Sequence, residues 1–237
     1  MDIVGAHEVH PHSWPYVAAI QDKNLGVCCG GALLERQWVL TTVPYEFELD
    51  VDTVPLILSD LGSQTQNVTH VVFCDKEPCP FDKLNVSRSI SSPGAQQIFG
   101  IMETFPHYQF DWPPFDNGIM LLKLNDTAKL NKYVQLLALP DFFEDVEPGT
   151  LCQVAGWGDT SPGKPSKYLR KTTLKIVSRK AGDSGGPLIC AGQCCGMVSF
   201  GEERENISIP GVYTQLTEEY IGWIKRTVRQ IYETRAF

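Results

Sequence analysis

Short apolar runs separated by Gly, Pro, Asn and Asp recur along most of this chain. Regularly spaced short runs of this kind are typical of β-sandwiches and β-barrels. They lie at Pro15–Ile20, Ala32–Leu34, Trp38–Thr41, Val54–Leu58, Ile119–Leu124, Leu151–Ala155, Met197–Phe200 and Gly211–Leu216. We expect the polar stretch Gly62–Ser92 to be a long surface loop. The pattern therefore predicts an all-β protein.

Helical periodicity is convincing only near the C-terminus. Tyr220, Trp223, Ile224, Val228 and Ile231 recur at helical spacing, and basic residues occupy other faces. We expect an amphipathic helix over about residues 218–233 that packs on its own domain.

Composition excludes several classes of protein. With 237 residues and 43% hydrophobic content, the chain can bury a core and is not disordered. No apolar run approaches the roughly 18 residues that a membrane-spanning helix needs. The net charge of −8 argues against a nucleic-acid partner. That charge is uneven, since an acidic first part precedes a basic stretch after residue 162.

Cysteines and sequons indicate an oxidising compartment. The chain has 8 Cys and no Cys-x-x-Cys pair, so a disulfide framework is favoured over a metal site, and no metal or cofactor is expected. Four Asn-x-Ser/Thr sequons point the same way, and glycosylation is expected at Asn67, Asn85, Asn125 and Asn206. We expect an extracellular or secretory-granule protein.

The strongest chemical motif is Gly182-Asp183-Ser184-Gly185-Gly186. A serine between glycines on a tight turn presents an uncrowded hydroxyl, and nearby N–H groups can face an oxyanion during acyl transfer. A plain turn is the alternative interpretation of this string on its own.

Further segments accompany this motif in order along the chain. They are Ile3-Val4-Gly5, Cys29-Gly30-Gly31, Trp38-Val39-Leu40-Thr41, Phe105-Pro106-His107, Leu130-Asn131-Lys132-Tyr133-Val134, Gly156-Trp157-Gly158 and Pro210-Gly211-Val212-Tyr213-Thr214. Together with the serine motif, they resemble the trypsin/chymotrypsin-like serine proteases, and granzymes A and K most closely. The resemblance implies two six-stranded antiparallel β-barrels and a C-terminal helix, in one domain over residues 3–237. The first barrel would span about 16–124 and the second about 134–218.

The same resemblance assigns roles within the site. Ser184 takes the nucleophile position, and the N–H groups of Gly182 and Ser184 form the oxyanion hole. Asp183 would pair with the ammonium of Ile3, which exists only after Met1 and Asp2 are removed. Substrate-binding positions correspond to Ser199, Phe200, Gly201 and Gly211.

Two catalytic groups of the family are absent. Pro44 stands at the position of the catalytic His, and proline cannot accept the serine proton. Gly118 stands at the position of the catalytic Asp, and Asp116 would have no His to orient. The five histidines, His7, His10, His12, His70 and His107, are interpreted as ordinary surface residues.

The chain also lacks a segment that family members carry. Lys180 runs directly into Ala181, where relatives have a barrel strand and the base of the primary specificity pocket. We therefore expect the second barrel to be incomplete, with an exposed strand edge. No substrate side chain can be inferred.

The resemblance implies a disulfide between Cys152 and Cys190. Cys29 matches a family cysteine whose partner is replaced by Tyr45. Cys74 and Cys79 either close their own loop or remain free thiols. Cys28, Cys194 and Cys195 are additional to the family pattern, and their pairing is open.

Three functions remain open, in this order. The first is a secreted protease homologue that is inactive or very weak and acts by binding a protein or peptide. The second is an active serine endopeptidase of which this sequence is a variant or a faulty gene model. The third is a module that binds polyanions, sulfated glycans among them. Its candidate residues lie in one basic stretch: Lys164, Lys167, Arg170, Lys171, Lys175, Arg179 and Lys180.

Overall fold

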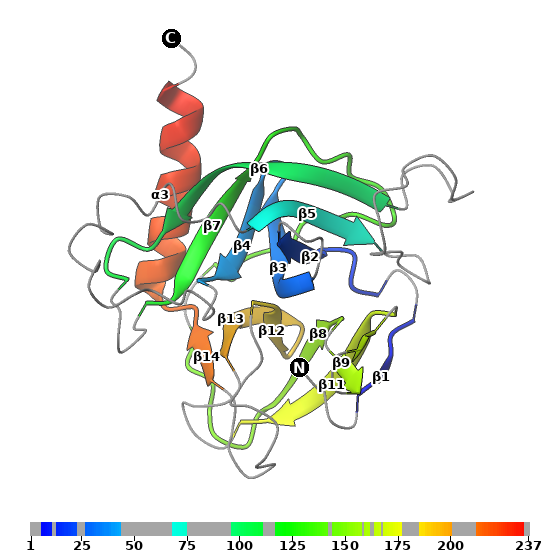
Figure 1. Ribbon diagram of the computed structural model, residues 1–237. Coiled ribbons are helices and arrows are strands. Elements are labelled where there is room, and N and C mark those ends of the chain that lie inside the picture. Colours follow the sequence, from blue (N-terminus) through cyan, green and yellow to red (C-terminus); the bar gives the residue numbers. More distant parts are fainter. Residues whose placement is uncertain are drawn as a thin grey trace, which may run out of the picture.

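Strands make up most of the structure, as Figure 1 shows for the computed structural model. It describes residues 6–10, 13–22, 27–43, 68–74, 96–110, 117–141, 144–157, 159–161, 164–166, 168–176, 185–200 and 212–234. The described strands form a closed barrel, a larger open sheet and a small hairpin. All of their pairings are antiparallel.

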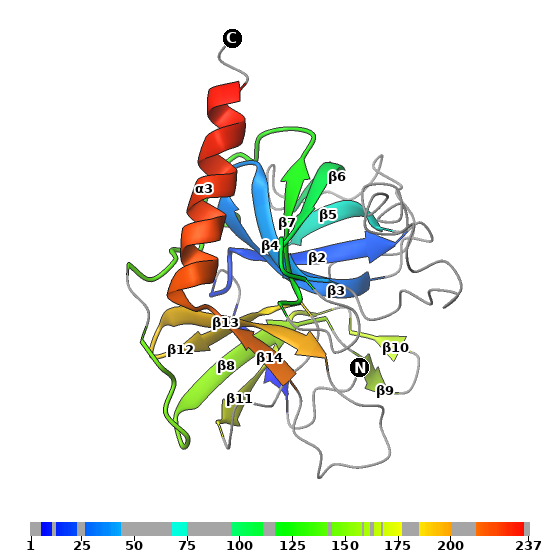
Figure 2. The same ribbon diagram turned by 90° about the vertical axis from the view of Figure 1, so that its left-hand side faces the viewer.

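The first unit is the closed barrel, with its strands in the order β2-β3-β4-β7-β6-β5. The strands are β2 (Val17–Asp22), β3 (Val27–Glu35), β4 (Trp38–Thr42), β5 (Val68–Cys74), β6 (Gln96–Pro106) and β7 (Ile119–Leu124). In Figures 1 and 2 this barrel lies above the second sheet. Closure leaves the barrel without an unpaired strand edge.

The second unit is a six-stranded sheet in the order β1-β11-β8-β12-β13-β14. Its strands are β1 (His7–Glu8), β8 (Leu151–Gly156), β11 (Arg170–Lys175), β12 (Pro187–Cys190), β13 (Gln193–Phe200) and β14 (Val212–Gln215). The hairpin consists of β9 (Asp159–Ser161) and β10 (Lys164–Pro165). Among the described strands, β1 and β14 form the ends of an open sheet. The expected all-β class with an incomplete second barrel is therefore confirmed.

The strands β4 and β7 are buried along their whole length because both of their faces pack. Val39 and Leu122 point into the barrel, where they meet Ile20 and Phe99. On the opposite face, residues of both strands join a core shared with the second sheet and the C-terminal helix. That shared core includes Trp38, Leu40, Ile119, Leu121, Ile189, Met197, Ile221 and Ile224. A third cluster, which includes Val154, Leu188 and Val198, fills the second sheet.

The expected C-terminal helix is α3 (Glu218–Thr234), which runs along the barrel in Figures 1 and 2. Thr217 caps its first turn, because the Thr217 hydroxyl oxygen accepts the Tyr220 N–H at 3.4 Å. Glu218 and Glu219 place negative charge at the positive end of the helix dipole. Ile221 and Ile224 bury the apolar face in the shared core.

The predicted surface loop over Gly62–Ser92 is wrong in its first part. Val68–Cys74 forms β5, which pairs with both β2 and β6 and closes the barrel. This strand includes His70, whose backbone pairs with Gly100. The segment contains Val, Thr and Phe, which favour strands. It was not predicted as a strand because the residues on both sides of it are polar. The expected run Val54–Leu58 lies outside the described residues.

Candidate functional site

The turn that follows Ser184 is seated against the first barrel. Gly185 has φ +84°, and a Cβ atom there would lie 2.5 Å from the carbonyl oxygen of Gly30. The Gly185 N–H donates to Val198 O at 2.5 Å, and the Val198 N–H donates to Gly186 O at 2.9 Å. Glycine is required here both by the backbone conformation and by the close approach of β3.

The end of β4 carries two buried hydroxyl groups, of which Thr41 bonds within the barrel and Thr42 bonds to the second sheet. Thr41 Oγ1 donates to Gly30 O at 2.8 Å, and Thr42 Oγ1 donates to Val198 O at 3.2 Å. The carbonyl groups of Gly30 and Val198 also border the Gly185–Gly186 turn. The chain leading to position 44 is therefore positioned relative to the turn that follows Ser184. These threonines were not identified from the sequence, where they read as ordinary strand residues.

Gly118, at the position where the aspartate of the family is expected, is a buried glycine directly before β7 and beside the end of β4. Gly118 accepts the Val43 N–H at 3.0 Å through its carbonyl oxygen. Asn117, directly before it, has φ +58°, a conformation that asparagine tolerates better than most residues. The hydrogen bond from Val43 thus ties the backbone of Gly118 to the end of β4, but Gly118 has no carboxylate.

Asn117 is held in place by the C-terminal helix and by the segment after β6. The Tyr220 hydroxyl donates to Asn117 Oδ1 at 2.5 Å, and Asn117 Nδ2 donates to Gln109 O at 2.9 Å. The sequence pattern did not reveal this role of Asn117. The signal available was the Asn-Gly pair, which is typical of positive φ.

His107 is not a surface residue, so the interpretation of all five histidines as surface residues is wrong for this one. It is 2% exposed, and its ring packs against Tyr108, Tyr220 and Trp223 at centroid distances of 4.4, 4.9 and 5.0 Å. Nδ1 accepts the Gln109 N–H at 3.3 Å. Nε2 is buried and has no hydrogen-bond partner within the described part of the chain. The docking of α3 buries this ring, and local sequence gives no sign of that contact.

The charge state of His107 predicts a pH dependence of stability. Burial lowers its pKa below the ordinary value of 6.5, Glu219 opposes this shift, and Arg226 adds to it. Because the unfolded chain takes up the proton first, this contribution to stability is complete above pH 6.5 and is lost as the pH falls below it. We expect His107→Gln to reduce the fall in Tm between about pH 7.5 and about pH 5.5. An equal fall in both proteins, measured by thermal denaturation, would contradict this expectation.

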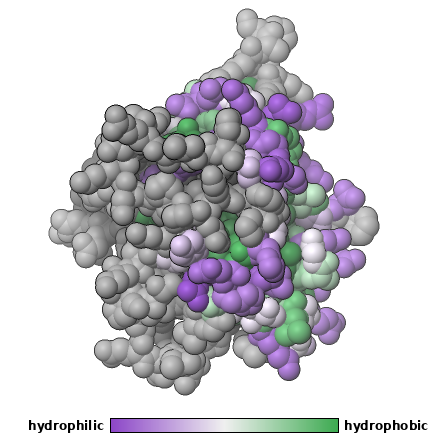
Figure 3. Space-filling model, turned by 90° about the vertical axis from the view of Figure 1, so that its right-hand side faces the viewer, coloured by the Kyte–Doolittle hydropathy of each residue, from purple (hydrophilic) through white to green (hydrophobic). Residues whose placement is uncertain are grey.

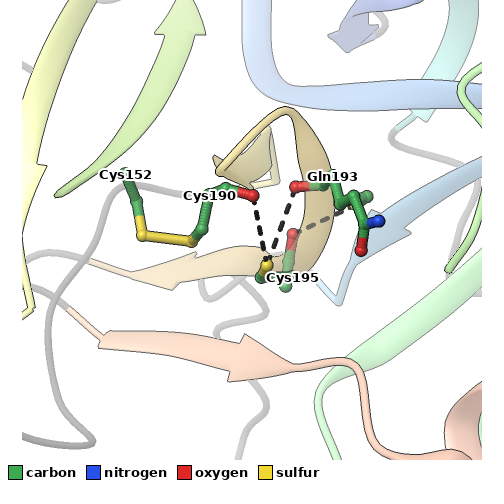
Figure 4. Close-up of a disulfide and its surroundings, with 6 residues drawn as sticks. Cys152, Cys190, Gln193 and Cys195 are labelled. Carbon is green, nitrogen blue, oxygen red and sulfur yellow. Dashed lines mark hydrogen bonds between the residues drawn. A yellow bond between two sulfur atoms is a disulfide. The ribbon is translucent and has the colours of Figure 1, made fainter. Parts of the chain in front are cut away.

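Cys152 and Cys190, on adjacent strands, form the disulfide that the resemblance implies, with Cα atoms 4.2 Å apart (Figure 4). Cys194 and Cys195 are not disulfide-bonded. Cys195 Sγ donates to the carbonyl groups of Cys190 and Gln193 at 3.8 and 3.7 Å. Burial raises the pKa of Cys194 to about 12 and raises that of Cys195. Both cysteines are therefore poor nucleophiles near neutral pH.

Several expected site residues lie outside the described residues. They are Ile3, Pro44, Gly182, Asp183, Ser184, Gly201 and Gly211, together with Cys79 and the sequon residues Asn67, Asn85 and Asn206. Ser199 and Phe200 belong to β13, and Cys74 ends β5, but only their backbone is described. The structure therefore brings together the surroundings of the site: the Gly185–Gly186 turn, the end of β4 and Gly118.

The described part of the chain offers neither a metal site nor a membrane-spanning helix. No group of three or more His, Cys, Asp or Glu side chains there could hold a metal ion. No helix there is long and apolar enough to cross a membrane.

In this fold a closed barrel and a second sheet meet at the turn that follows the serine of the Gly-Asp-Ser-Gly-Gly motif. This arrangement is that of the trypsin-like class of proteins. The family profile for trypsin matches residues 3–43, 82–181 and 179–224. The chain belongs to the trypsin family of serine proteases and their homologues, as the resemblance indicated.

Individual relatives are granzyme-like. Mast cell protease 3 of Ovis aries is 31% identical over 96% of this chain and 90% of its own length. Granzyme A of Bos taurus is 29% identical over 95% and 88%. The solved structure of human heparin binding protein is 25% identical, covers 96% of this chain and 97% of its own, and has a TM-score of 0.69.

Proposed function

We propose that this protein is a secreted, granzyme-like protease homologue that is inactive or very weak as a peptidase and acts by binding a protein or peptide. The observation that carries the proposal is Gly118. In the family reaction, a carboxylate at this position orients the histidine that accepts the serine proton. The backbone of Gly118 is bonded to the residue that follows β4, but glycine has no side chain that could accept a hydrogen bond from a histidine.

The base is the second missing group. Pro44 follows Val43, the last described residue after β4, and proline carries no titratable group. His107 is a poor substitute, because its ring is packed among three aromatic rings and its Nδ1 accepts a backbone N–H. In well-studied serine proteases, the oxyanion hole and binding alone leave about 10³–10⁴-fold over water. We therefore expect at most a very weak hydrolase.

The profile match supports two losses in the family pattern. Its first part ends at residue 43, directly before Pro44, and its last two parts meet at residues 179–181, where Lys180 joins Ala181. These are the two places where the catalytic base and the base of the specificity pocket would lie. An active endopeptidase, of which this sequence is a variant or a faulty gene model, is the alternative that also fits these two breaks.

Fluorophosphonate labelling of the purified protein tests the loss of activity. We expect no more label on the natural chain than on Ser184→Ala, because an unactivated serine reacts slowly. Trypsin labelled under the same conditions is the positive control. Strong, Ser184-dependent labelling would exclude the inactive homologue. An in-frame genomic coding block at the Lys180–Ala181 join would favour the active alternative.

Localisation outside the cell or in a secretory granule is part of the same proposal. The disulfide Cys152–Cys190 supports it, because such bonds persist mainly in oxidising compartments. The sequons, including the exposed Asn125, are consistent with passage through that pathway.

A second candidate function is binding of a sulfated glycan through the basic stretch. Leu174 packs into the core of the second sheet. Residues that alternate with it, Lys171 and Lys175, therefore lie on the outer face of β11. Arg170 Nη2 donates to Ala6 O, and thus supports the edge of the sheet. Among the other basic residues, Lys164 lies in β10, and Lys167, Arg179 and Lys180 lie outside the described residues. A similar solved structure is named heparin binding protein, which favours testing this ligand.

Heparin chromatography tests this candidate. We expect the double variant Lys171→Gln/Lys175→Gln to elute at lower salt than the natural chain, because each lost cation removes a counterion-releasing contact. Lys129→Gln/Lys225→Gln is the matched control, since both of these lysines are exposed and neither belongs to the second sheet: Lys129 lies beside Gln97 of β6, and Lys225 lies in α3. Equal elution of the two double variants, or no retention of the natural chain near physiological salt, would contradict this function.

A further inference from the structure

Several large apolar side chains are exposed among the described residues, and the coloured part of Figure 3 shows apolar residues among hydrophilic ones. Two of them, Ile98 and Met102, lie on β6 and are 36% and 46% exposed. Phe99 and Ile101, which alternate with them, pack into the barrel core. Ile98 and Gly100 therefore lie on the outer face of the barrel. Met102, at the irregularity in the pairing between Ile101 and Glu103, is exposed as well and extends them into an apolar strip.

Asn125 lies directly over the centre of this apolar strip. Its N–H donates to Gly100 O at 3.0 Å, and its side-chain Oδ1 accepts the Gly100 N–H at 3.1 Å. A Cβ atom on Gly100 would lie 3.1 Å from Asn125 Nδ2. The absence of a side chain at position 100 thus makes room for the Asn125 carboxamide, whose nitrogen lies over Gly100, the residue midway between Ile98 and Met102 along β6.

Asn125 also begins the sequon Asn125-Asp126-Thr127, whose three residues are all exposed on the bend after β7. An N-linked glycan is attached through the side-chain nitrogen of such an asparagine. In that transfer, Nδ2 bonds to C1 of the first N-acetylglucosamine and loses a proton. The bond from C1 to the diphosphate of the lipid-linked donor breaks, and the lipid diphosphate leaves.

We propose that Asn125 carries an N-linked glycan whose first sugar covers the apolar strip Ile98–Gly100–Met102. The sugar starts from an atom that lies over Gly100, so its less polar ring face can pack on the side chains to either side. The covered surface is removed from water, which is favourable for apolar groups. In the natural setting this inference rests on the proposed entry into the secretory pathway.

A second protein is a weaker candidate for covering this strip. Stable interfaces bury about 800 Å² on each partner. Two partly exposed side chains, Ile98 and Met102, supply only a small part of such an area. The sequon supplies an occupant already tethered at the centre of the strip.

The full chain, expressed behind a secretion leader with Asn67→Gln, Asn85→Gln and Asn206→Gln, isolates the Asn125 site. An endoglycosidase that cleaves between the first two sugars then leaves a single N-acetylglucosamine. Thr127→Ala abolishes the sequon but keeps the Asn125 carboxamide, and Thr127→Ser keeps both. The readout is the rate at which peroxide oxidises Met102 in the folded protein, measured by peptide mass spectrometry.

We expect the sugar to slow oxidation of Met102 at least about fivefold relative to Thr127→Ala, since sulfoxide formation needs access to the thioether. Thr127→Ser should behave like the parent. Met120 and Met197 are 3% and 0% exposed, and serve as internal controls for global unfolding. If the triple variant does not fold, glycopeptide mapping and the same oxidation assay are applied to the chain with all four sequons.

An unmodified Asn125, or equal oxidation rates with and without the sugar, would overturn the proposal. Because the leader and the oxidation assay do not depend on Ser184 or on the native compartment, such a result would leave the proposed inactivity untouched. Conversely, finding an active protease would not alter the oxidation result.

Discussion

Replacing Gly185 by alanine is expected to lower the free energy of unfolding by about 3 kcal/mol or more. An L-residue at φ +84° is strained, and its Cβ would also meet Gly30 O at 2.5 Å and Gly30 N at 2.9 Å. Relief requires the Gly185–Gly186 turn to move away from β3. That movement would break the hydrogen bond from Gly185 N–H to Val198 O. Denaturant unfolding of the purified variant measures the effect.

Gly192→Ala is the matched control for this prediction. Gly192 has φ +82°, so the backbone strain is nearly the same, but no atom lies within 4 Å of the position that its Cβ would take. We expect it to cost only about 1–2 kcal/mol. Equal losses in the two variants would show that the contact between the turn and β3 does not contribute, which would undermine the described geometry beside Ser184.

Removal of the disulfide, as Cys152→Ala/Cys190→Ala, is expected to cost about 2–4 kcal/mol of unfolding free energy. The bond closes a loop of 38 residues, and it lies in the core of the second sheet beside Leu188 and Val198. Because this sheet is open at β1 and β14 among the described strands, we expect the loss to appear there first. Hydrogen exchange of β8 and β12, together with denaturant unfolding, measures it.

Cys195→Ala is the control, because it removes a cysteine thiol but no disulfide bond. Cys195 contacts the carbonyl groups of Cys190 and Gln193 but forms no disulfide (Figure 4). Its weak S–H hydrogen bonds should contribute less than about 1 kcal/mol. If this variant were as unstable as Cys152→Ala/Cys190→Ala, local packing and not the cross-link would account for the stability.

The hydrophobic pattern predicts an element correctly where residue type alone determines burial. Ile119–Leu124 is found as β7 with the bounds expected, and the periodic residues near the C-terminus form α3. Both elements bury apolar side chains in the shared core, so their hydrophobic pattern is strong. It failed for Val68–Cys74, where a strand lies inside a polar region and is stabilised by pairing with β2 and β6.

Around the candidate site, too, the sequence shows which residues are present, and only the fold shows which of them are in contact. The Asn117-Gly118 pair could have indicated positive φ, but only the fold shows the hydrogen bond that Asn117 accepts from Tyr220, a residue far away in sequence. Similarly, the sequon at Asn125 is visible in the sequence, whereas its position over Gly100 depends on the pairing of β6 with β7.

The amino-acid sequence by itself determined the family, the strands β4 and β7 of the shared core and the chemical identity of the residues at positions 44 and 118. These are properties of residue type and order, which no folding can change. Only the tertiary structure decided that His107 is buried, that β5 closes the barrel and that Gly185 packs against Gly30. Each of these depends on contacts between distant segments, whose free energy arises when the barrel, the sheet and α3 pack together.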